Sequence, residues 1–529
     1  MSTDPQAART SYDEVPYASY PFAQTHPDRL ATLGRLFGLE PAPVAACRVL
    51  ELGCAAGGNL IPMATALPQA EFVGVDLSSV QVAEGLRIIE ALGLRNIRLL
   101  AMSIDEVDER LGSFDYVLTH GVYSWVPGTV QEAILRICAD QMRHNGIAYV
   151  SYNTLPGWRM RGMIRDLMRF HAMGFRDARE RVAQARAILD FLAKSVSAGG
   201  TAFANSAYGM LLKSELEDLR GRADHYILHE HLEDSNEPLY FHEFMERAHK
   251  HGLQYLADAD FSTMLATNFP SEVTQTLQRI APDLIRQEQF MDFLRNRTFR
   301  QTLLVHKDVA VNRKLTPQRM TPLWVSGELQ PAQPDADLSS NEGLEFRSPG
   351  GGQLTTPRPI TKAALVVLSR HWPEALPFAE LVRSAAALLD HRTRESGQQN
   401  MTTAEGLAGD LLRAYGAGLI ELHATPSGFV TRPEARPTAS PLARWQVGHG
   451  LTDLTTLRHQ TARVEQDLGG ILQLLDGSHD RRSLERAVAD SILKGPGGKS
   501  MSRSAVESAA RKRVDDALAQ LGRLALLVA

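Results

Sequence analysis

Glutamate, glycine and aspartate residues follow two neighbouring apolar segments near the start of the chain. The first segment, residues 48–52, is rich in strand-forming residues and leads into the turn Gly53-Cys54-Ala55-Ala56-Gly57-Gly58. Residues 60–67 then have a helical pattern, and a helix N-terminus at such a turn can face a ligand. The second segment ends in Asp76, whose carboxylate can reach two ribose hydroxyls. This pairing predicts a site for a nucleotide-like cofactor.

The glycine spacing and Glu51 restrict the identity of that cofactor. A dinucleotide site needs the pattern G-x-G-x-x-G, because its middle glycine lets the backbone approach a pyrophosphate, and this chain has G-x-x-x-G-G. A Walker loop is excluded because no G-K-S/T follows the glycines. Glu51 would repel a phosphate and attract a cationic amino-acid headgroup. The turn therefore fits a cofactor with an amino group and a ribose, or an ordinary strand-turn-helix connection without a ligand.

The composition is typical of a cytoplasmic enzyme with several domains. The chain has 529 residues, 44% of them hydrophobic, which is enough for roughly two to four domains. We find no apolar segment long enough to cross a bilayer and no signal-peptide core at the N-terminus. Cys47, Cys54 and Cys138 are widely spaced and predict buried thiols rather than disulfides or a zinc site. The net charge of -5 provides no overall basic surface for nucleic acid.

Strand and helix patterns alternate up to residue 152, as in a doubly wound parallel sheet. We expect strands at 48–52, 72–76, 97–101, 114–120 and 146–152, with helices between them. Ligands bind beyond the carboxyl ends of such strands. Ser103 and Ile104, which follow the third strand, are therefore expected to border an adenine.

The sixth and seventh strands are expected after a long helical segment. Residues 253–260 and 300–306 have strand patterns, and residues 271–299 between them are helical. Residues 159–251 are also mostly helical, and a connection of this length inside a domain is usually functional. We therefore expect a helical insertion between strands five and six that roofs the substrate side of the sheet.

The motif E-x-G-x-x-x-G with a downstream aspartate resembles motif I of the class I S-adenosylmethionine-dependent methyltransferases. Residues 119–127, 151–158 and 290–304 resemble segments of bacterial methyltransferases that carry a methyltransferase regulatory domain. That group includes rickettsial protein lysine methyltransferases that modify outer-membrane proteins. The likeness covers about residues 10–306. It implies an α/β fold with a seven-stranded Rossmann-like sheet, S-adenosylmethionine as cofactor, and lysine side chains of a protein as methyl acceptors.

The motif and the strand ends define the expected cofactor contacts. Glu51 would meet the amino group and Asp76 the ribose. An aromatic N-terminal segment with Tyr12, Tyr17 and His26 would cover the site. The complete set of expected cofactor residues is Tyr12, Glu51, Gly53, Cys54, Gly57, Asn59, Asp76, Leu77, Ser103, Ile104 and His120.

Aromatic residues after strands four and five are candidates for the methyl-acceptor site. Tyr123, Trp125, Tyr152 and Trp158 would form a wall that attracts an alkylammonium group by cation–π interaction, or else they pack in the core or a lid. Asn153 would orient the incoming nitrogen through its carbonyl oxygen. We treat these five as the expected catalytic-site residues.

The general base is left open by the sequence. A protonated lysine must lose a proton before transfer, and a tyrosinate, His120 or a water path could accept it. The loop after strand four lacks the Asn/Asp-Pro-Pro-aromatic motif of many amino-methyltransferases. This departure disfavours a nucleic-acid base as substrate.

The composition changes after residue 306. Residues 307–357 are rich in proline, glycine and serine and predict a linker or extended arm. Residues 358–432 have three helical segments and a hairpin pattern, as in a winged-helix domain, and residues 442–529 form a helical domain that repeats this plan more weakly. The expected organisation is a catalytic domain at 1–306, with a regulatory-domain-like segment at about 213–300, and a mostly helical, winged-helix-like C-terminal region.

Six histidines in or beside the expected insertion do not form a metal-binding motif. They lack the sequence HExxH, and scattered histidines on a polar face are commoner than metal sites. These residues are His225, His229, His231, His242, His249 and His251. We expect them to take part in protein contacts, and we expect no metal.

Three functions are consistent with the sequence. The first is methylation of protein lysine, with an outer-membrane or other surface protein as the partner before its export. In this case the C-terminal region would dock the substrate or mediate self-association. The second is N- or O-methylation of a small molecule. The third is a binding protein that senses the cofactor and uses its winged-helix-like modules to recognise partners.

Overall fold

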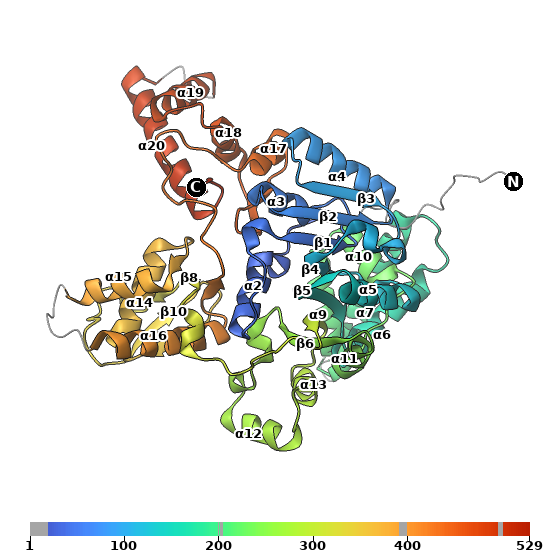
Figure 1. Ribbon diagram of the computed structural model, residues 1–529. Helices are drawn as coiled ribbons and strands as arrows, with labels where there is room; N and C mark the ends of the chain where they lie inside the picture. The colour runs from blue at the N-terminus through green and yellow to red at the C-terminus, as the bar shows by residue number, and fades with distance from the viewer. Residues whose placement is uncertain (1–18, 199, 201–204, 391–398, 496–500) are drawn as a thin grey trace.

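The computed structural model describes residues 19–198, 200, 205–390, 399–495 and 501–529. It contains one mixed sheet between two layers of helices, a helical insertion, and two smaller units that follow the sheet in the sequence (Figure 1). Within these ranges, none of the helices combines the length and apolar character that a membrane span requires.

The central sheet has the strand order β3-β2-β1-β4-β5-β7-β6. Its strands are β1 (Arg48–Leu52), β2 (Glu71–Asp76), β3 (Ile97–Ala101), β4 (Phe114–Thr119), β5 (Met142–Asn153), β6 (Leu253–Asp258) and β7 (Phe299–His306). β1 to β5 are parallel, and β7 runs antiparallel to both of its neighbours. This topology confirms the predicted class I methyltransferase sheet. β5 begins earlier than predicted, because its first residues pair with Phe114 across a register shift.

Alternate residues of each strand point to opposite faces of the sheet. One face is covered by α2 (Pro27–Leu36), α3 (Leu60–Ala66) and α4 (Ser79–Leu92), and the other by α5 (Gly128–Asp140) and α11 (Phe241–Lys250). In β1, Val49 packs on the first face and Leu50 on the second. The parallel strands are thus buried on both faces, and the side chains that follow their carboxyl ends are left for a site.

A helical insertion follows β5 and has a hydrophobic core of its own. It consists of α6 (Gly157–Ala172), α7 (Ala178–Ala198), α9 (Ala207–Arg220), α10 (Asp224–Ile227) and a π-helical turn at Leu228–Leu232. Leu189 and Leu212 are buried in this core. The predicted insertion extended to residue 251, but α11 belongs to the sheet layer, because Phe241 and Phe244 are buried against the strands.

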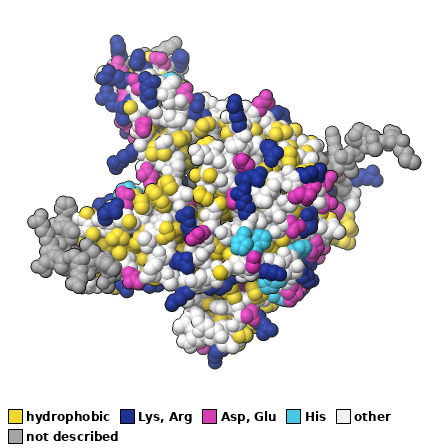
Figure 2. Space-filling model, viewed as in Figure 1, with side chains coloured by type: hydrophobic (Ala, Val, Ile, Leu, Met, Phe, Trp, Pro, Cys, Tyr) yellow, Lys and Arg dark blue, Asp and Glu magenta, His cyan; other side chains and the backbone are white. Residues whose placement is uncertain are grey.

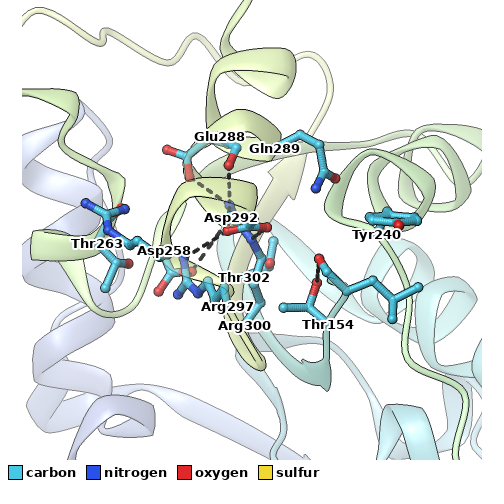
Figure 3. Close-up of polar contacts among 12 residues, drawn as sticks. Thr154, Tyr240, Asp258, Thr263, Glu288, Gln289, Asp292, Arg297, Arg300 and Thr302 are labelled. Atoms are coloured by element: carbon cyan, nitrogen blue, oxygen red, sulfur yellow. Dashed lines mark hydrogen bonds and ion pairs between the residues drawn. The ribbon is translucent and has the colours of Figure 1, made fainter. Parts of the chain in front are cut away.

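Two helices, α12 (Ser271–Ile280) and α13 (Leu284–Arg295), connect β6 to β7, and a buried ion cluster holds α13 against the sheet (Figure 3). Arg300 of β7 donates to Asp292 at 2.8 and 2.9 Å and to Glu288 at 3.0 Å. Arg297 donates to Asp258 of β6 at 2.7 Å. Three carboxylates therefore share two guanidinium groups in the interior of the protein.

Two C-terminal units have the same plan. In the first repeat, β8 (Trp324–Ser326) lies between β12 (Leu376–Pro377) and β13 (Glu421–His423), with α14 (Pro359–His371), α15 (Phe378–Asp390) and α16 (Gln399–Gly416). In the second repeat, Thr438 and Ala439 bridge to Asp476 and Leu527, with α18 (Gln466–Leu474), α19 (Arg481–Lys494) and α20 (Arg503–Arg523). In both repeats the strand that comes first in the sequence is the central one.

The segment predicted as a linker, residues 307–357, is folded. Besides β8 it contains a three-stranded sheet of β9 (Gln330–Pro331), β10 (Leu344–Arg347) and β11 (Gln353–Thr356). Most of its proline, glycine and serine residues lie in the turns between these short strands. Leu323 and Phe346 are buried in the same core as Leu30 and Phe72 of the sheet layer. The first repeat and the methyltransferase sheet therefore share one hydrophobic core.

In the second repeat, a helix and a hairpin precede α18. They are α17 (Pro441–Gly448) and the pair β14 (Asp453–Thr455) and β15 (Thr461–Arg463). α17 packs beside α3 and α4, as Figure 1 also shows. The second repeat thus lies against the helix that follows the glycine turn.

The ion cluster predicts a strong effect of Arg300 on stability. Replacing Arg300 with Met would leave buried carboxylates without their counter-charge, which typically costs about 3–5 kcal/mol. We expect a large drop in the melting temperature of Arg300→Met, measured by thermal unfolding. Arg110→Met, which removes an exposed pair with Asp108, is the control and is expected to melt like the wild type. Equal melting temperatures for the two variants would contradict this role of the cluster.

The same cluster predicts a pH dependence of stability. Burial raises the pKa of Glu288 from 4.5 to about 7, although the Arg300 charge opposes this. Because the folded state holds this proton more tightly than the unfolded state, its contribution to stability is full below about pH 4.5 and is lost as the pH rises through 7. We expect Glu288→Gln to reduce the difference in melting temperature between about pH 6 and pH 8. An unchanged difference would show that Glu288 does not titrate in this range.

Candidate active site

The turn after β1 is fixed by hydrogen bonds to β2 and by a close approach to the loop after β4. The backbone N–H groups of Gly53 and Cys54 both donate to the Val75 carbonyl, at 2.8 and 3.0 Å. Gly53 has φ +79°, and a Cβ there would lie 2.4 Å from the Val122 side chain. Gly57, at φ +74°, turns the chain into α3. A side chain at Gly53 would therefore collide with Val122.

Asp76 lies at the end of β2, beside this turn. One of its carboxylate oxygens accepts the backbone N–H of Ala55 at 2.8 Å, and the other accepts that of Ser78 at 2.9 Å. Ala55 is a non-glycine residue in the left-handed region, at φ +49°, which places its N–H toward the aspartate. Leu77 is 65% exposed next to it. The aspartate is thus oriented at the edge between β1 and β2.

The residues after β3 lie next to Asp76, as predicted for an adenine-binding edge. The backbone N–H of Met102 donates to the Asp76 carbonyl at 3.0 Å. Ile104 is buried, whereas Ser103 is half-buried and caps a short 3-10 helix, Ile104–Glu106. The structure therefore brings the carboxyl ends of β1, β2 and β3 together around one edge.

Glu51 is the buried acidic group of the site. Its side chain is 3% exposed, and Oε1 accepts a hydrogen bond from Asn59 Nδ2 at 2.7 Å. Oε2 is buried with no hydrogen-bond partner among the described residues. Burial raises the pKa of Glu51 to about 8, the Asn59 bond opposes this, and the Asp76 charge adds to it. An unpaired buried oxygen is unfavourable, so this atom fits a ligand that donates hydrogen bonds.

Asn59 holds Glu51 and is itself held by residues from two other parts of the chain. Its Oδ1 accepts the backbone N–H of Phe22 at 3.0 Å and lies 2.7 Å from Nε2 of His459. A backbone N–H can only donate, so the atom that faces Phe22 is the oxygen and the Nδ2 group points to Glu51. Asn59 precedes α3 but makes no side-chain capping bond. The side-chain amide of Asn59 instead donates to Glu51.

The N-terminal segment covers the glycine turn. Ser19 Oγ accepts the backbone N–H of Gly58 at 2.7 Å, and a Cβ at Gly58 would lie 2.4 Å from the Ser19 carbonyl oxygen. The Phe22 ring lies 3.9 Å from the His120 ring, centroid to centroid. Tyr12 and Tyr17, predicted to cover the cofactor, lie outside the described residues. His26 accepts the backbone N–H of Asp28 at the start of α2.

His120 lies at the end of β4, where the sequence predicted it, but it is a poor base. Its Nδ1 is 2.8 Å from the Tyr149 hydroxyl. Burial lowers the pKa of His120 to about 4. The imidazole is therefore neutral near pH 7 and has little tendency to take a proton.

The predicted aromatic wall is wrong for two of its four residues. Tyr123 and Tyr152 are fully buried, and both rings contact Phe244 of α11, at 5.3 and 4.2 Å between centroids. They pack in the core under the sheet, because α11 covers that face. Trp125 and Trp158 instead contact each other edge to face, at 6.0 Å.

Asn153 lies at the end of β5, beside the segment that leads out of the insertion. Its Nδ2 donates to Asn236 Oδ1 at 3.0 Å, and its backbone N–H donates to Ser124 Oγ at 2.9 Å. The side chain is almost completely buried. Asn236 therefore positions the side-chain amide of Asn153, and Ser124 positions its backbone.

The histidines of the insertion do not converge on one point. His225, His229 and His231 lie on α10 and the π-helical turn, whereas His242 and His249 lie on α11. Across the described ranges, no group of three or more His, Cys, Asp or Glu side chains is arranged to hold a metal ion.

Sequence reasoning missed several residues that build this site. Ala55 orients Asp76, Phe22 and Ser19 cover the turn, and His459 contacts Asn59 from a position 400 residues away. The positive φ of Ala55 has no sequence signature, since alanine rarely adopts it. A histidine in a polar hairpin likewise carries no local sign of a distant partner.

Three family models match the chain. The methyltransferase domain model matches residues 49–146, the predicted methyltransferase regulatory domain model matches residues 223–306, and the model of the PKMT C-terminal winged helix domain matches residues 435–526. The first match contains the glycine turn and Asp76. The second contains α11, α13 and the ion cluster around Arg300.

The chain is also similar to two proteins of one rickettsial species, and to the first of them over most of its length. An uncharacterised protein of Rickettsia prowazekii (strain Madrid E) is 38% identical over 497 residues, which is 92% of this chain and 87% of the relative. A second protein of that strain is 42% identical over 242 residues, which is 46% of this chain and 95% of the relative.

Two solved structures match the whole molecule. PKMT2 from Rickettsia typhi superposes with a TM-score of 0.86 at 30% identity, covering 97% of this chain and 100% of PKMT2. The complex of that protein with AdoHcy superposes with a TM-score of 0.85 over the same shares of the two chains. The sheet order, the glycine turn and these matches show that the chain belongs to the family of S-adenosylmethionine-dependent class I methyltransferases with a methyltransferase regulatory domain and a PKMT C-terminal winged-helix domain.

Proposed function

We propose that this protein transfers a methyl group from S-adenosylmethionine to lysine side chains of a protein substrate. The observation that carries the proposal is the unpaired, buried oxygen of Glu51 beside the oriented carboxylate of Asp76. A cofactor with a cationic amino group and free ribose hydroxyls would satisfy both groups.

The residues of the site bind and orient rather than react. Glu51 would hold the amino group of the cofactor, and Asp76 would accept from the ribose hydroxyls. When bound, S-adenosylmethionine supplies an electrophilic methyl group on its sulfonium. Phe22 and His120 close the front of the site and exclude water, which favours alignment of an amine over hydrolysis.

The lysine substrate is supported by the relatives and by the substrate side of the sheet. The matched structure is a PKMT, an abbreviation used for protein lysine methyltransferases, and the second repeat matches the winged-helix model of the same group. Trp125, which is half-buried and packs on the buried Trp158, offers aromatic surface to an alkylammonium group, and Asn153 offers an amide. The helical insertion, whose first helix contains Trp158, would cover a long side chain. We propose a surface protein, before its export, as the substrate.

A nucleic-acid binding function is less well supported. Lys and Arg side chains gather around α19 and α20 on the face shown in Figure 2, but acidic side chains lie among them. Several are paired, for example Arg503 with Glu507 at 3.0 Å and Arg481 with Glu485 at 3.4 Å. Such mixed charge does not form the continuous basic surface that nucleic acid requires.

We expect cofactor binding to weaken when Asp76 is replaced. Asp76→Ala removes the ribose contacts and the anchor of Ala55, and loss of hydrogen bonds to a charged group costs about 1.5–3 kcal/mol, or roughly a 10- to 150-fold weaker Kd. Isothermal titration calorimetry with S-adenosylmethionine measures this directly. Glu84→Ala, on the exposed side of α4, is the control. A wild-type protein that shows no binding would overturn the proposed function.

Glu51 predicts that cofactor affinity rises with pH. Its pKa of about 8 means that the free protein carries a neutral Glu51 near pH 7, whereas a cationic amino group favours the ionised form. Binding should therefore release a proton below pH 8, and affinity should increase from about pH 6 to pH 8 and then level off. Calorimetry in two buffers of different ionisation enthalpy counts the proton. Glu51→Gln should lose both the proton release and the pH dependence, and a wild type without them would contradict this role.

The acceptor is tested by transfer of a labelled methyl group. The full-length protein is incubated with labelled S-adenosylmethionine and either lysine-rich proteins, including surface-protein fragments, or a small-molecule extract. We expect label in protein, recovered as methyl-lysine after hydrolysis, and less label with Asp76→Ala at the same cofactor concentration. Label only in small molecules would exclude the protein-lysine proposal and leave the cofactor site intact.

A further inference from the structure

Three consecutive residues at the tip of the β14–β15 hairpin contact three different parts of the molecule. The Leu457 backbone N–H donates to the Ala525 carbonyl at 2.9 Å, which ties the tip to the end of the second repeat. Arg458 donates to both oxygens of Glu421 in the first repeat, at 2.6 and 2.8 Å, and its guanidinium lies 4.0 Å from the centroid of the Trp372 ring. The next residue, His459, reaches the methyltransferase domain.

The side chain of His459 makes a hydrogen bond to Asn59 of the methyltransferase domain. Its backbone is in the left-handed region, at φ +57°, and its side chain is only 5% exposed. Nε2 lies 2.7 Å from Asn59 Oδ1, and the ring centroid lies 5.2 Å from that of His26. Because Asn59 Oδ1 can only accept, Nε2 must carry the proton and donate.

The burial of His459 keeps this donor in one form. Burial, and to a smaller extent the neighbouring His26, lowers the pKa of His459 well below its usual range. The imidazole therefore stays neutral around pH 7, with its proton on Nε2. A non-glycine residue in the left-handed region is uncommon, and here the turn aims the side chain into the methyltransferase domain instead of into solvent.

The contact reaches the carboxylate of Glu51 through a single amide. Asn59 accepts from His459 on its oxygen side and donates from its nitrogen side to Glu51 Oε1 at 2.7 Å. Hydrogen bonds in such a chain polarise one another. The His459 donor therefore joins the Phe22 N–H and the Thr25 hydroxyl in holding the Asn59 amide, and it strengthens the bond that orients Glu51.

We propose that His459 is a positioning residue for the cofactor site, and that the β14–β15 hairpin of the second repeat thereby sets the affinity for S-adenosylmethionine. The inference rests on the proposed cofactor binding at Glu51 and Asp76. It gives the C-terminal winged-helix region a role within its own chain. His459 itself is buried and is occupied by this contact.

Two substitutions of His459 separate positioning from a general effect on folding. Asn tolerates the left-handed backbone but is too short to reach Asn59, whereas Gln carries an N–H donor on a longer side chain. Full-length His459→Asn is expected to bind S-adenosylmethionine about tenfold more weakly, the effect of about one hydrogen bond. His459→Gln is expected to lie within about threefold of the wild type. Gln460→Ala, with an exposed side chain at the neighbouring position, is the matched control and should bind like the wild type.

A second measurement uses the wild type alone. Because coupling between two sites is reciprocal, binding of S-adenosylhomocysteine should hold the hairpin in place more firmly. Hydrogen–deuterium exchange in a peptide that spans residues 453–463 is therefore expected to slow when this compound is added. This readout depends neither on a variant nor on catalytic activity.

The outcomes distinguish the inference from the proposed function. If the wild type does not bind S-adenosylmethionine, the proposed function fails. If the wild type binds and a folded His459→Asn binds equally well, the positioning role is overturned while the cofactor site stands. If His459→Asn does not fold, the exchange measurement decides, and a hairpin that exchanges at the same rate with and without S-adenosylhomocysteine overturns the inference.

Discussion

The orientation of one buried carboxylate is the constraint on which the site depends. Glu51 lies inside the protein with one oxygen held by Asn59 and the other unpaired among the described residues. A carboxylate in this position is unfavourable without a partner, and its raised pKa expresses that cost. In the proposed function, a cationic headgroup would restore the lost interaction. Asn59 keeps the bonded oxygen, Oε1, in place.

The fold meets this constraint with segments from the whole chain. The sheet order places Glu51 next to Asp76 and His120, because β1 lies between β2 and β4. Phe22 of the N-terminal segment and His459 of the second repeat both contact Asn59, the residue that holds Glu51. The first repeat is joined to the sheet by a continuous core, and Asp28 of α2 pairs with His423 of β13 at 2.9 Å. The C-terminal region is therefore part of the structure that supports the site.

The sequence predicted the elements whose side-chain pattern is local. The strands of the sheet, the glycine turn, Glu51 and Asp76 were all readable, because strand periodicity and turn chemistry are properties of neighbouring residues. Tyr123 and Tyr152 were misplaced, because an aromatic residue after a strand has the same pattern whether it faces a substrate or packs under a helix such as α11. The sequence of residues 307–357 predicts a linker although the segment is folded, because its strands are very short and its turns are rich in glycine and proline. The contact of His459 with Asn59 could not be predicted, since it depends on the arrangement of three units and on a left-handed backbone that histidine seldom adopts.

A crystal structure of the full chain with S-adenosylhomocysteine would show whether Glu51, held by Asn59, anchors the cofactor. We expect the amino group of the ligand within about 3 Å of Glu51 Oε2, with the Asn59 bond to Oε1 and the His459 bond to Asn59 both retained, and the ribose hydroxyls on Asp76. A complex in which the amino group binds elsewhere, or in which Asn59 turns away from Glu51, would contradict this role of Glu51.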